Sequence, residues 1–135
     1  MFKKTLLIAM MISLACVTSS FGYDYTTGTI VQYGPGSKQS SSMGANQHQD
    51  GYWYFTAFVQ ACNYGSTLGT SSVADASCCT YGISVRSYDS TFQNDSLSER
   101  APSGNFSNIN VFVYLTVSGE EGFAAGQANA TWAQN

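Results

Sequence analysis

Alternating hydrophobic and polar positions are the strongest pattern along the chain. In residues 52–64 alternate positions from Trp53 to Ala61 are apolar, and in residues 109–117 every second residue is Ile, Val or Leu. Residues 79–87 show a weaker form of the same alternation. A period of two places alternate side chains on opposite faces of a β-strand, and no helical period competes with it. The pattern therefore predicts three strands, each with one buried and one partly exposed face.

Two further strands are predicted towards the ends of the chain. Residues 26–33 read as a strand, and residues 123–133 carry a stripe of alanine and glycine that ends in Trp132. We expect the second of these to return from residues 109–117 through a hairpin, because the SGEEG sequence at 118–122 has two glycines that tolerate positive φ. The stripe of small residues indicates the close approach of another sheet or another chain.

Long polar segments separate these strands, at residues 34–51, 65–77 and 88–108. They exceed the usual length of a hairpin loop, so each either contains short extra strands or carries function. Five to eight strands with such connections predict an all-β fold, a single antiparallel β-sandwich or jelly-roll domain over residues 23–135.

The first residues have the features of a secretory signal peptide. Lys3 and Lys4 precede an apolar stretch, and small residues follow it up to Gly22. This pattern predicts a signal peptide at residues 1–22 and a secreted protein, extracellular or periplasmic. Cys16 leaves an alternative open, in which this cysteine becomes a lipid anchor. No apolar stretch approaches the 20 or so residues of a membrane span, so we expect no transmembrane segment.

Charge and composition exclude some partners and favour others. Beyond the leader the fixed positive charges are Lys38, Arg86 and Arg100. Three cations cannot neutralise a run of phosphates, so neither nucleic acid nor an anionic membrane surface is an expected partner. Charged residues make up 10% of the chain and aromatic residues 14%, and most other polar residues are uncharged. This composition suits a surface that binds neutral partners, above all carbohydrate, although it also suits any soluble β-protein.

Catalytic chemistry has little support in the sequence. His48 is the one histidine, and no G-x-S-x-G sequence is present, although Asp50 follows two residues later. A Ser-His-Asp arrangement needs a base, and a lone loop histidine is weak evidence for one. We therefore predict no catalytic residues and a protein that is not an enzyme.

Metal sites are also weakly supported. One histidine and a pair of adjacent cysteines do not match the ligand spacing of a zinc site. The segment YDSTFQNDSLSE offers oxygen ligands suited to calcium, without the spacing of an EF-hand loop. We predict no cofactor and no metal, with calcium on this segment as the alternative. The oxygen-bearing residues are Asp89, Asn94, Asp95 and Glu99.

The sequence NQHQDGYWYF at 46–55 is the best candidate for ligand binding. It combines aromatic rings with amide and carboxylate groups, and both kinds of group bind sugars in β-sandwich proteins. We predict a non-enzymatic binding module for carbohydrate or a cell surface, lectin-like in character; the opposing interpretation places these aromatic residues in the core. The predicted ligand-binding residues are Asn46, His48, Asp50, Tyr52 and Tyr54, with Asp89, Asn94 and Asp95 as a second group.

A self-associating structural or adhesive subunit is the alternative function. Strands rich in Tyr, Gln and Asn favour pairing between sheet edges, so a homo-oligomer joined through those edges is possible. The segment YDYTTGTIVQY at 23–33 could donate a strand to a neighbouring copy. A small secreted hydrolase or toxin is a weaker alternative.

The cysteines are expected to stabilise the fold. An exported protein meets an oxidising compartment, where disulfides form. Strand register predicts a Cys62–Cys78 disulfide on one face and Cys79 as a buried free thiol on the other. A bulge before Thr80 would instead select Cys62–Cys79, and a bond between the adjacent cysteines ranks third. The sequence shows no feature that would lower a thiol pKa for redox chemistry.

Overall fold

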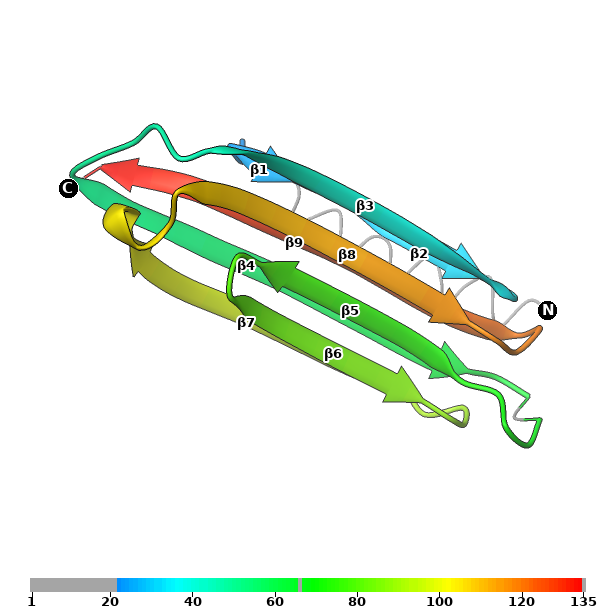
Figure 1. Cartoon of the computed structure of the whole chain (residues 1–135). Coiled ribbons are helices and arrows are strands. Elements are labelled where there is room, and N and C mark those ends of the chain that lie inside the picture. Colours follow the sequence, from blue (N-terminus) through cyan, green and yellow to red (C-terminus); the bar gives the residue numbers. More distant parts are fainter. Residues whose placement is uncertain (1–21, 66, 135) are drawn as a thin grey trace.

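A computed structural model describes residues 22–65 and 67–134, and these residues fold almost entirely as β-strands (Figure 1). One turn of 3-10 helix, η1, interrupts them at Ser103–Asn105. The strands are β1 (Tyr25–Thr26), β2 (Ile30–Tyr33), β3 (Gly36–Ala45), β4 (Gly51–Asn63), β5 (Ser72–Cys78), β6 (Tyr81–Ser87), β7 (Gln93–Pro102), β8 (Asn108–Val117) and β9 (Gly122–Gln134).

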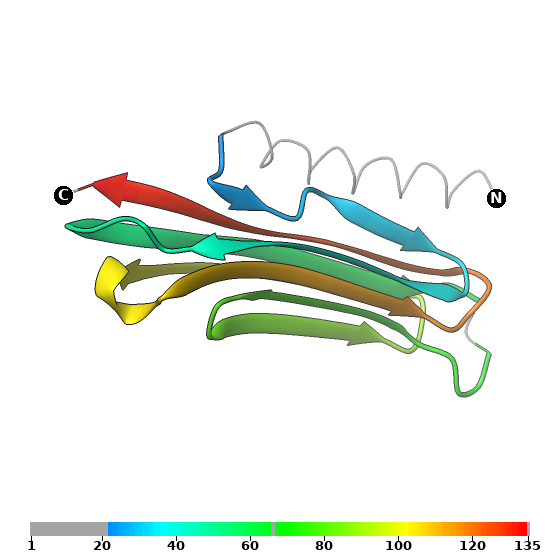
Figure 2. The same cartoon turned by 45° about the horizontal axis from the view of Figure 1, so that its top comes forward.

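Two antiparallel sheets pack face to face, so the predicted β-sandwich is confirmed (Figures 1 and 2). In sheet A the order is β1–β9–β4–β7, and β2 also pairs with β9. In sheet B the order is β3–β8–β5–β6. Strands β4 and β9 stay paired from Gly51 with Gln134 to Asn63 with Gly122, which makes them the rigid centre of sheet A.

The core lies between the inner faces, as the alternation predicts. Along β4 the apolar positions that begin with Trp53 and Phe55 are buried, and along β8 those from Ile109 to Val117 are buried opposite them. The small-residue stripe of β9 also faces inwards. At Gly126 an added Cβ would lie 3.0 Å from Val113, so the stripe lets the two sheets approach closely.

The predicted hairpin between the last two strands is wrong, because β8 belongs to sheet B and β9 to sheet A. Residues 118–122 carry the chain from one sheet to the other. The reason is that each strand has one apolar face. The structure buries these two faces by packing them against each other across the sandwich, not by pairing the strands within one sheet. Gly119 and Gly122 are needed for space and do not adopt positive φ; an added Cβ would clash with Asn63 at the first and with Val117 at the second.

The long polar segments contain strands, the first of the two options that the sequence left open. Each holds one strand, namely β3, β5 or β7, and two of these, β3 and β7, are mostly exposed strands at sheet edges. The segment at 23–33 forms β1 and β2, which are separated near Gly28 with its φ of 66°. Both short strands pair with β9 of the same chain instead of being free for donation.

The predicted signal peptide and Cys16 lie outside the described residues, apart from Gly22 at the end of the leader. Within the described residues no helix has the length and apolar character needed to cross a membrane.

Candidate ligand-binding site

The loop between β3 and β4 is held in place by Asn46. Its side-chain amide donates to the carbonyl oxygens of Ser103 and Phe106, at 2.6 and 2.9 Å. Its oxygen accepts hydrogen bonds from the backbone of His48 and from the indole N–H of Trp53. Asn46 therefore uses its polar atoms within the fold and acts as a brace for the loop rather than as a ligand contact.

His48 is exposed and lies against aromatic residues at one end of the core. Its ring stacks on Trp132 with centroids 4.6 Å apart and meets Trp53 edge-on at 5.4 Å. Tyr25 packs against Trp53 from β1. Gly51 must be glycine here, since a Cβ would clash with Trp132. The neighbouring Asp50 is exposed and has a φ of 61°, as a tight entry into β4 requires. Trp53 is the buried member of this aromatic cluster and serves packing, whereas His48 lies exposed at its rim.

Tyr52 and Tyr54 lie on the other face of β4, as the alternation predicts. Both project from the outer face of sheet A, and Tyr54 is 38% exposed. The Arg100 guanidinium carbon lies 3.6 Å from the centroid of the Tyr52 ring and 5.6 Å from that of Tyr54. Arg100 comes from β7, where it pairs directly with Tyr54. We call Tyr52, Tyr54 and Arg100 the tyrosine platform.

Hydroxyl groups flank the tyrosine platform. Thr131 of β9 is the other direct neighbour of Tyr54, and Ser98 of β7 shares the outer face two positions along from Arg100. Directly paired residues such as Tyr54 and Thr131 have Cβ atoms about 5 Å apart, and a diagonal neighbour such as Ser98, which pairs with Thr56, lies about 7–8 Å away. Both distances are within reach of one bound ligand. The platform thus joins aromatic faces with polar groups on three adjacent strands, where the hydrogen-bonded sheet holds them in fixed positions.

The second predicted group does not join the first. Asn94 and Asp95 lie on β7 opposite Gln60 and Val59, so they are displaced from Tyr54 by about 20 Å along the strands. Asp95 also projects from the opposite face of β7 to Arg100, and its carboxylate accepts from the backbone of Ser96.

Asp89 lies in the β6–β7 loop. There its carboxylate accepts a hydrogen bond from the backbone N–H of Thr91, at 2.8 Å, and its carbonyl accepts one from Asn63. Across the described residues no group of three or more His, Cys, Asp or Glu side chains could hold a metal ion. The proposed calcium ligands are spread along an extended strand and its preceding loop, which keeps them apart.

The predicted Cys62–Cys78 disulfide is wrong, because the thiols of Cys62, Cys78 and Cys79 are all free. Cys78 ends β5 beside the carbonyl oxygens of Thr56 and Asn129, six positions along β4 from Cys62. Six residues of a strand span about 20 Å, far beyond the reach of a disulfide.

The faces of the adjacent cysteines are also reversed from those predicted. Cys78 is buried in the core, whereas Cys79 is only half-buried and lies in the β5–β6 turn with a φ of 57°. The reason is that β5 runs through the segment expected to be a loop and ends at Cys78. Burial raises the pKa of Cys78 to about 12 and also raises the pKa of Cys62. Both thiols therefore stay protonated at neutral pH, consistent with structural roles.

A separate polar cavity of about 440 Å³ lies between the β4–β5 and β8–β9 connections. Its lining combines hydroxyl groups, glycine backbone and two carboxylates, from Thr67, Thr70, Ser118, Gly119, Glu120 and Glu121, with Gly65 at its rim. Sequence reasoning assigned Glu120 and Glu121 to a hairpin tip and so missed this cavity. Arg100 was also not predicted, because it lies in the polar segment 88–108, where the sequence left open both an extra strand and a functional loop. The alternation of apolar residues is too weak in β7 to reveal the strand.

No family model matches the chain, and no curated protein sequence matches it. The solved structures that it resembles include the enzymatically active domain of tailspike protein 4 of bacteriophage CBA120, with 15% identity and a TM-score of 0.37. The match covers 78% of this chain and 15% of the tailspike chain.

Carbohydrate-binding modules are also among these structures. TmCBM61, solved in complex with β-1,4-galactotriose, is 12% identical with a TM-score of 0.36, over 79% of this chain and 69% of that one. Family 16 Carbohydrate Binding Module-2 is 12% identical with a TM-score of 0.36, over 84% of this chain and 88% of that one. Similarity at this level carries no argument about what the chain binds, so function must be argued from the site itself.

Proposed function

We propose that this protein is an exported, non-enzymatic binding module that holds a glycan on the tyrosine platform. The observation that carries the proposal is the placement of Tyr54. Its ring is exposed on the outer face of sheet A, directly between Arg100 and Thr131 on the neighbouring strands. Sugar rings have apolar faces that pack on aromatic rings, and their hydroxyl groups bond to polar side chains beside the ring. The platform offers both from one rigid surface.

The scaffold supports binding because it limits the entropy lost when a ligand is held. The platform residues lie within β4, β7 and β9, so the backbone beneath them is hydrogen-bonded on both sides along β4. Arg100 also rests on Tyr52, which restricts a long and otherwise flexible side chain. A surface that is ordered before binding gives more affinity from the same contacts.

Export belongs to the proposal and rests on the leader at residues 1–22. A glycan-binding protein meets its ligand outside the cell or in the periplasm, so location and function agree. We also propose that the protein is not an enzyme, because its sequence has one histidine and no G-x-S-x-G sequence.

Retention on polysaccharides tests the proposal. The protein without its leader is mixed with a panel of insoluble polysaccharides and run in affinity gels containing soluble ones. We expect retention by at least one, and Tyr54→Ala should weaken it at least tenfold. Tyr114→Ala is the matched control, because Tyr114 is 37% exposed on the outer face of sheet B against 38% for Tyr54. Failure of every polysaccharide to retain the protein, or an equal loss in both variants, would refute the proposal.

A further inference from the structure

Arg100 is the one charged residue that β4, β7 and β9 carry on the outer face of sheet A. Strand register assigns alternate positions of these strands to that face, and every other such position carries an uncharged residue. Glu99, its neighbour in sequence, points to the opposite face of β7. Asp24, just before β1, places a carboxylate at the β9 side of the same sheet, where it accepts a hydrogen bond from the backbone N–H of Trp132 at 2.7 Å. The positive charge of the platform therefore lies on its β7 side, at Arg100, while the Asp24 carboxylate on the β9 side is bonded to the backbone and the chain as a whole has a net charge of −3.

The donors of Arg100 are available to a ligand. No hydrogen bond or ion pair joins its guanidinium to another residue in the described part of the chain, and the guanidinium lies instead against the rings of Tyr52 and Tyr54. A guanidinium in contact with an aromatic face keeps N–H groups at its edge, pointing away from the ring. A cation held by aromatic stacking, with its donors free, is suited to an anionic partner.

Resting on the proposed function, we infer that the glycan is acidic and that Arg100 binds a uronate carboxylate of the sugar that packs on Tyr54. A planar carboxylate accepts two parallel hydrogen bonds from the edge of a guanidinium, and such charge-assisted pairs are roughly twice as strong as neutral ones. The hydroxyl groups of Ser98 and Thr131 remain for the sugar hydroxyls.

Tyr52 acts as a positioning residue in this arrangement. The guanidinium carbon of Arg100 lies 3.6 Å from the centroid of the Tyr52 ring. The guanidinium therefore covers that face of the ring, and the sugar cannot pack on it. The stack holds the charged group beside Tyr54, 5.6 Å from that ring. Lysine carries a point charge without the planar fork, so Arg100→Lys should not restore the preference for carboxylate.

The test compares matched acidic and neutral polymers. Binding of the leaderless protein to polygalacturonate and to alginate is measured by affinity electrophoresis and calorimetry, each against its fully methyl-esterified form. We expect at least tenfold tighter binding to one of the acids than to its ester, and we expect high salt to reduce that preference. Dextran sulfate serves as the sulfated arm, and equal or tighter binding there would overturn the assignment of a carboxylate.

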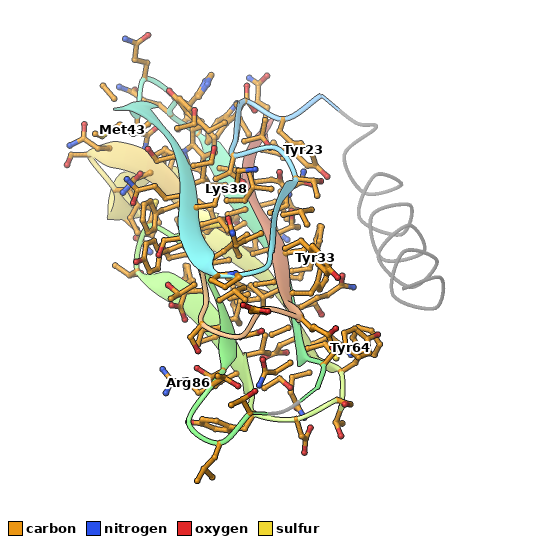
Figure 3. All side chains as sticks on the ribbon, turned by 90° about the vertical axis from the view of Figure 1, so that its right-hand side faces the viewer. Tyr23, Tyr33, Lys38, Met43, Tyr64 and Arg86 are labelled. Carbon is orange, nitrogen blue, oxygen red and sulfur yellow. The ribbon has the colours of Figure 1, made fainter. Side chains whose placement is uncertain are left out.

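Two arginine variants complete the test. Arg100→Gln should abolish the preference for the acid over its ester, whereas Arg86→Gln should leave that preference unchanged. Arg86 is the matched control because it is also an exposed arginine beside a tyrosine, on β6 of sheet B rather than in sheet A (Figure 3). Equal binding to acid and ester would overturn the inference and leave the proposed function standing. Failure of all polysaccharides, neutral ones included, would remove both.

Discussion

Two arginines lie beside tyrosines in this molecule, and the contrast between them shows what makes a candidate site. Arg100 and Tyr52 come from different strands of sheet A, with 3.6 Å between guanidinium carbon and ring centroid. Arg86 and Tyr88 are two residues apart near the end of β6, with 5.8 Å between the same points. Arg86 donates to the Tyr88 hydroxyl at 3.1 Å, and this bond raises the pKa of Arg86.

The difference lies in what supports each pair. Tyr88 is 61% exposed and follows the last residue of β6, so little fixes its position. Tyr52 is half-buried within β4, and the inward-facing residue next to it, Trp53, is 1% exposed. The same two residue types therefore form a local surface contact in one place and a supported platform in the other.

Removal of the buried residue behind the platform is expected to have the largest effect on stability. Trp53→Ala would leave a cavity among Tyr25, His48 and Trp132 and would remove the bond to Asn46. We expect a loss of about 3–5 kcal/mol in the free energy of unfolding, measured in urea. Val85→Ala, which truncates a half-buried residue next to Arg86, should cost about 1 kcal/mol. Similar losses in the two variants would mean that the platform has no special support.

Ionisation of the buried Cys78 thiol is expected to destabilise the folded protein at alkaline pH. The two arginine sites should therefore be compared below that pH. The pKa of this thiol is about 12 in the folded protein, raised by burial from 9.0. The folded state thus holds the proton more tightly, so its contribution is present below about pH 9 and is lost as the pH rises towards about 12. We expect a loss on the order of 1 kcal/mol by about pH 10.

Urea unfolding of the wild type and of Cys78→Ala at a neutral and an alkaline pH measures this effect. The variant should be less stable at neutral pH, because it loses core packing, and should show a smaller fall at alkaline pH. Identical falls in the two proteins would contradict the assignment to Cys78.

The smallest expected effect is the coupling energy of the Arg100–Tyr52 pair. A double-mutant cycle with Arg100→Gln and Tyr52→Leu should give about 0.5–1 kcal/mol, the range of an exposed cation–π contact. The same cycle on Arg86 and Tyr88 should give no measurable coupling. A stronger coupling between Arg86 and Tyr88 than between Arg100 and Tyr52 would contradict the prediction that the shorter guanidinium-to-ring distance gives the larger coupling energy.

Much of the fold follows from the sequence where one face of a strand is buried. The alternation in 52–64 and 109–117 assigns Trp53, Tyr52 and Tyr54 to their observed faces, because a side-chain period of two leaves no other arrangement. The edge strands β3 and β7 gave no such signal. Most of their residues are exposed, so neither face needs to be apolar. For this reason the sequence did not indicate that Arg100 lies on a strand.

The sequence by itself determined an all-β chain, the buried face of its central strands and the aromatic character of residues 46–55. The tertiary structure decided which sheet each strand joins, because hydrogen bonds between strands join residues far apart in the chain. It placed β8 and β9 in opposite sheets, kept Cys62 away from Cys78, and brought Arg100 beside Tyr52 and Tyr54. The platform exists only through the β4–β7 register, and no local pattern in the sequence encodes that pairing.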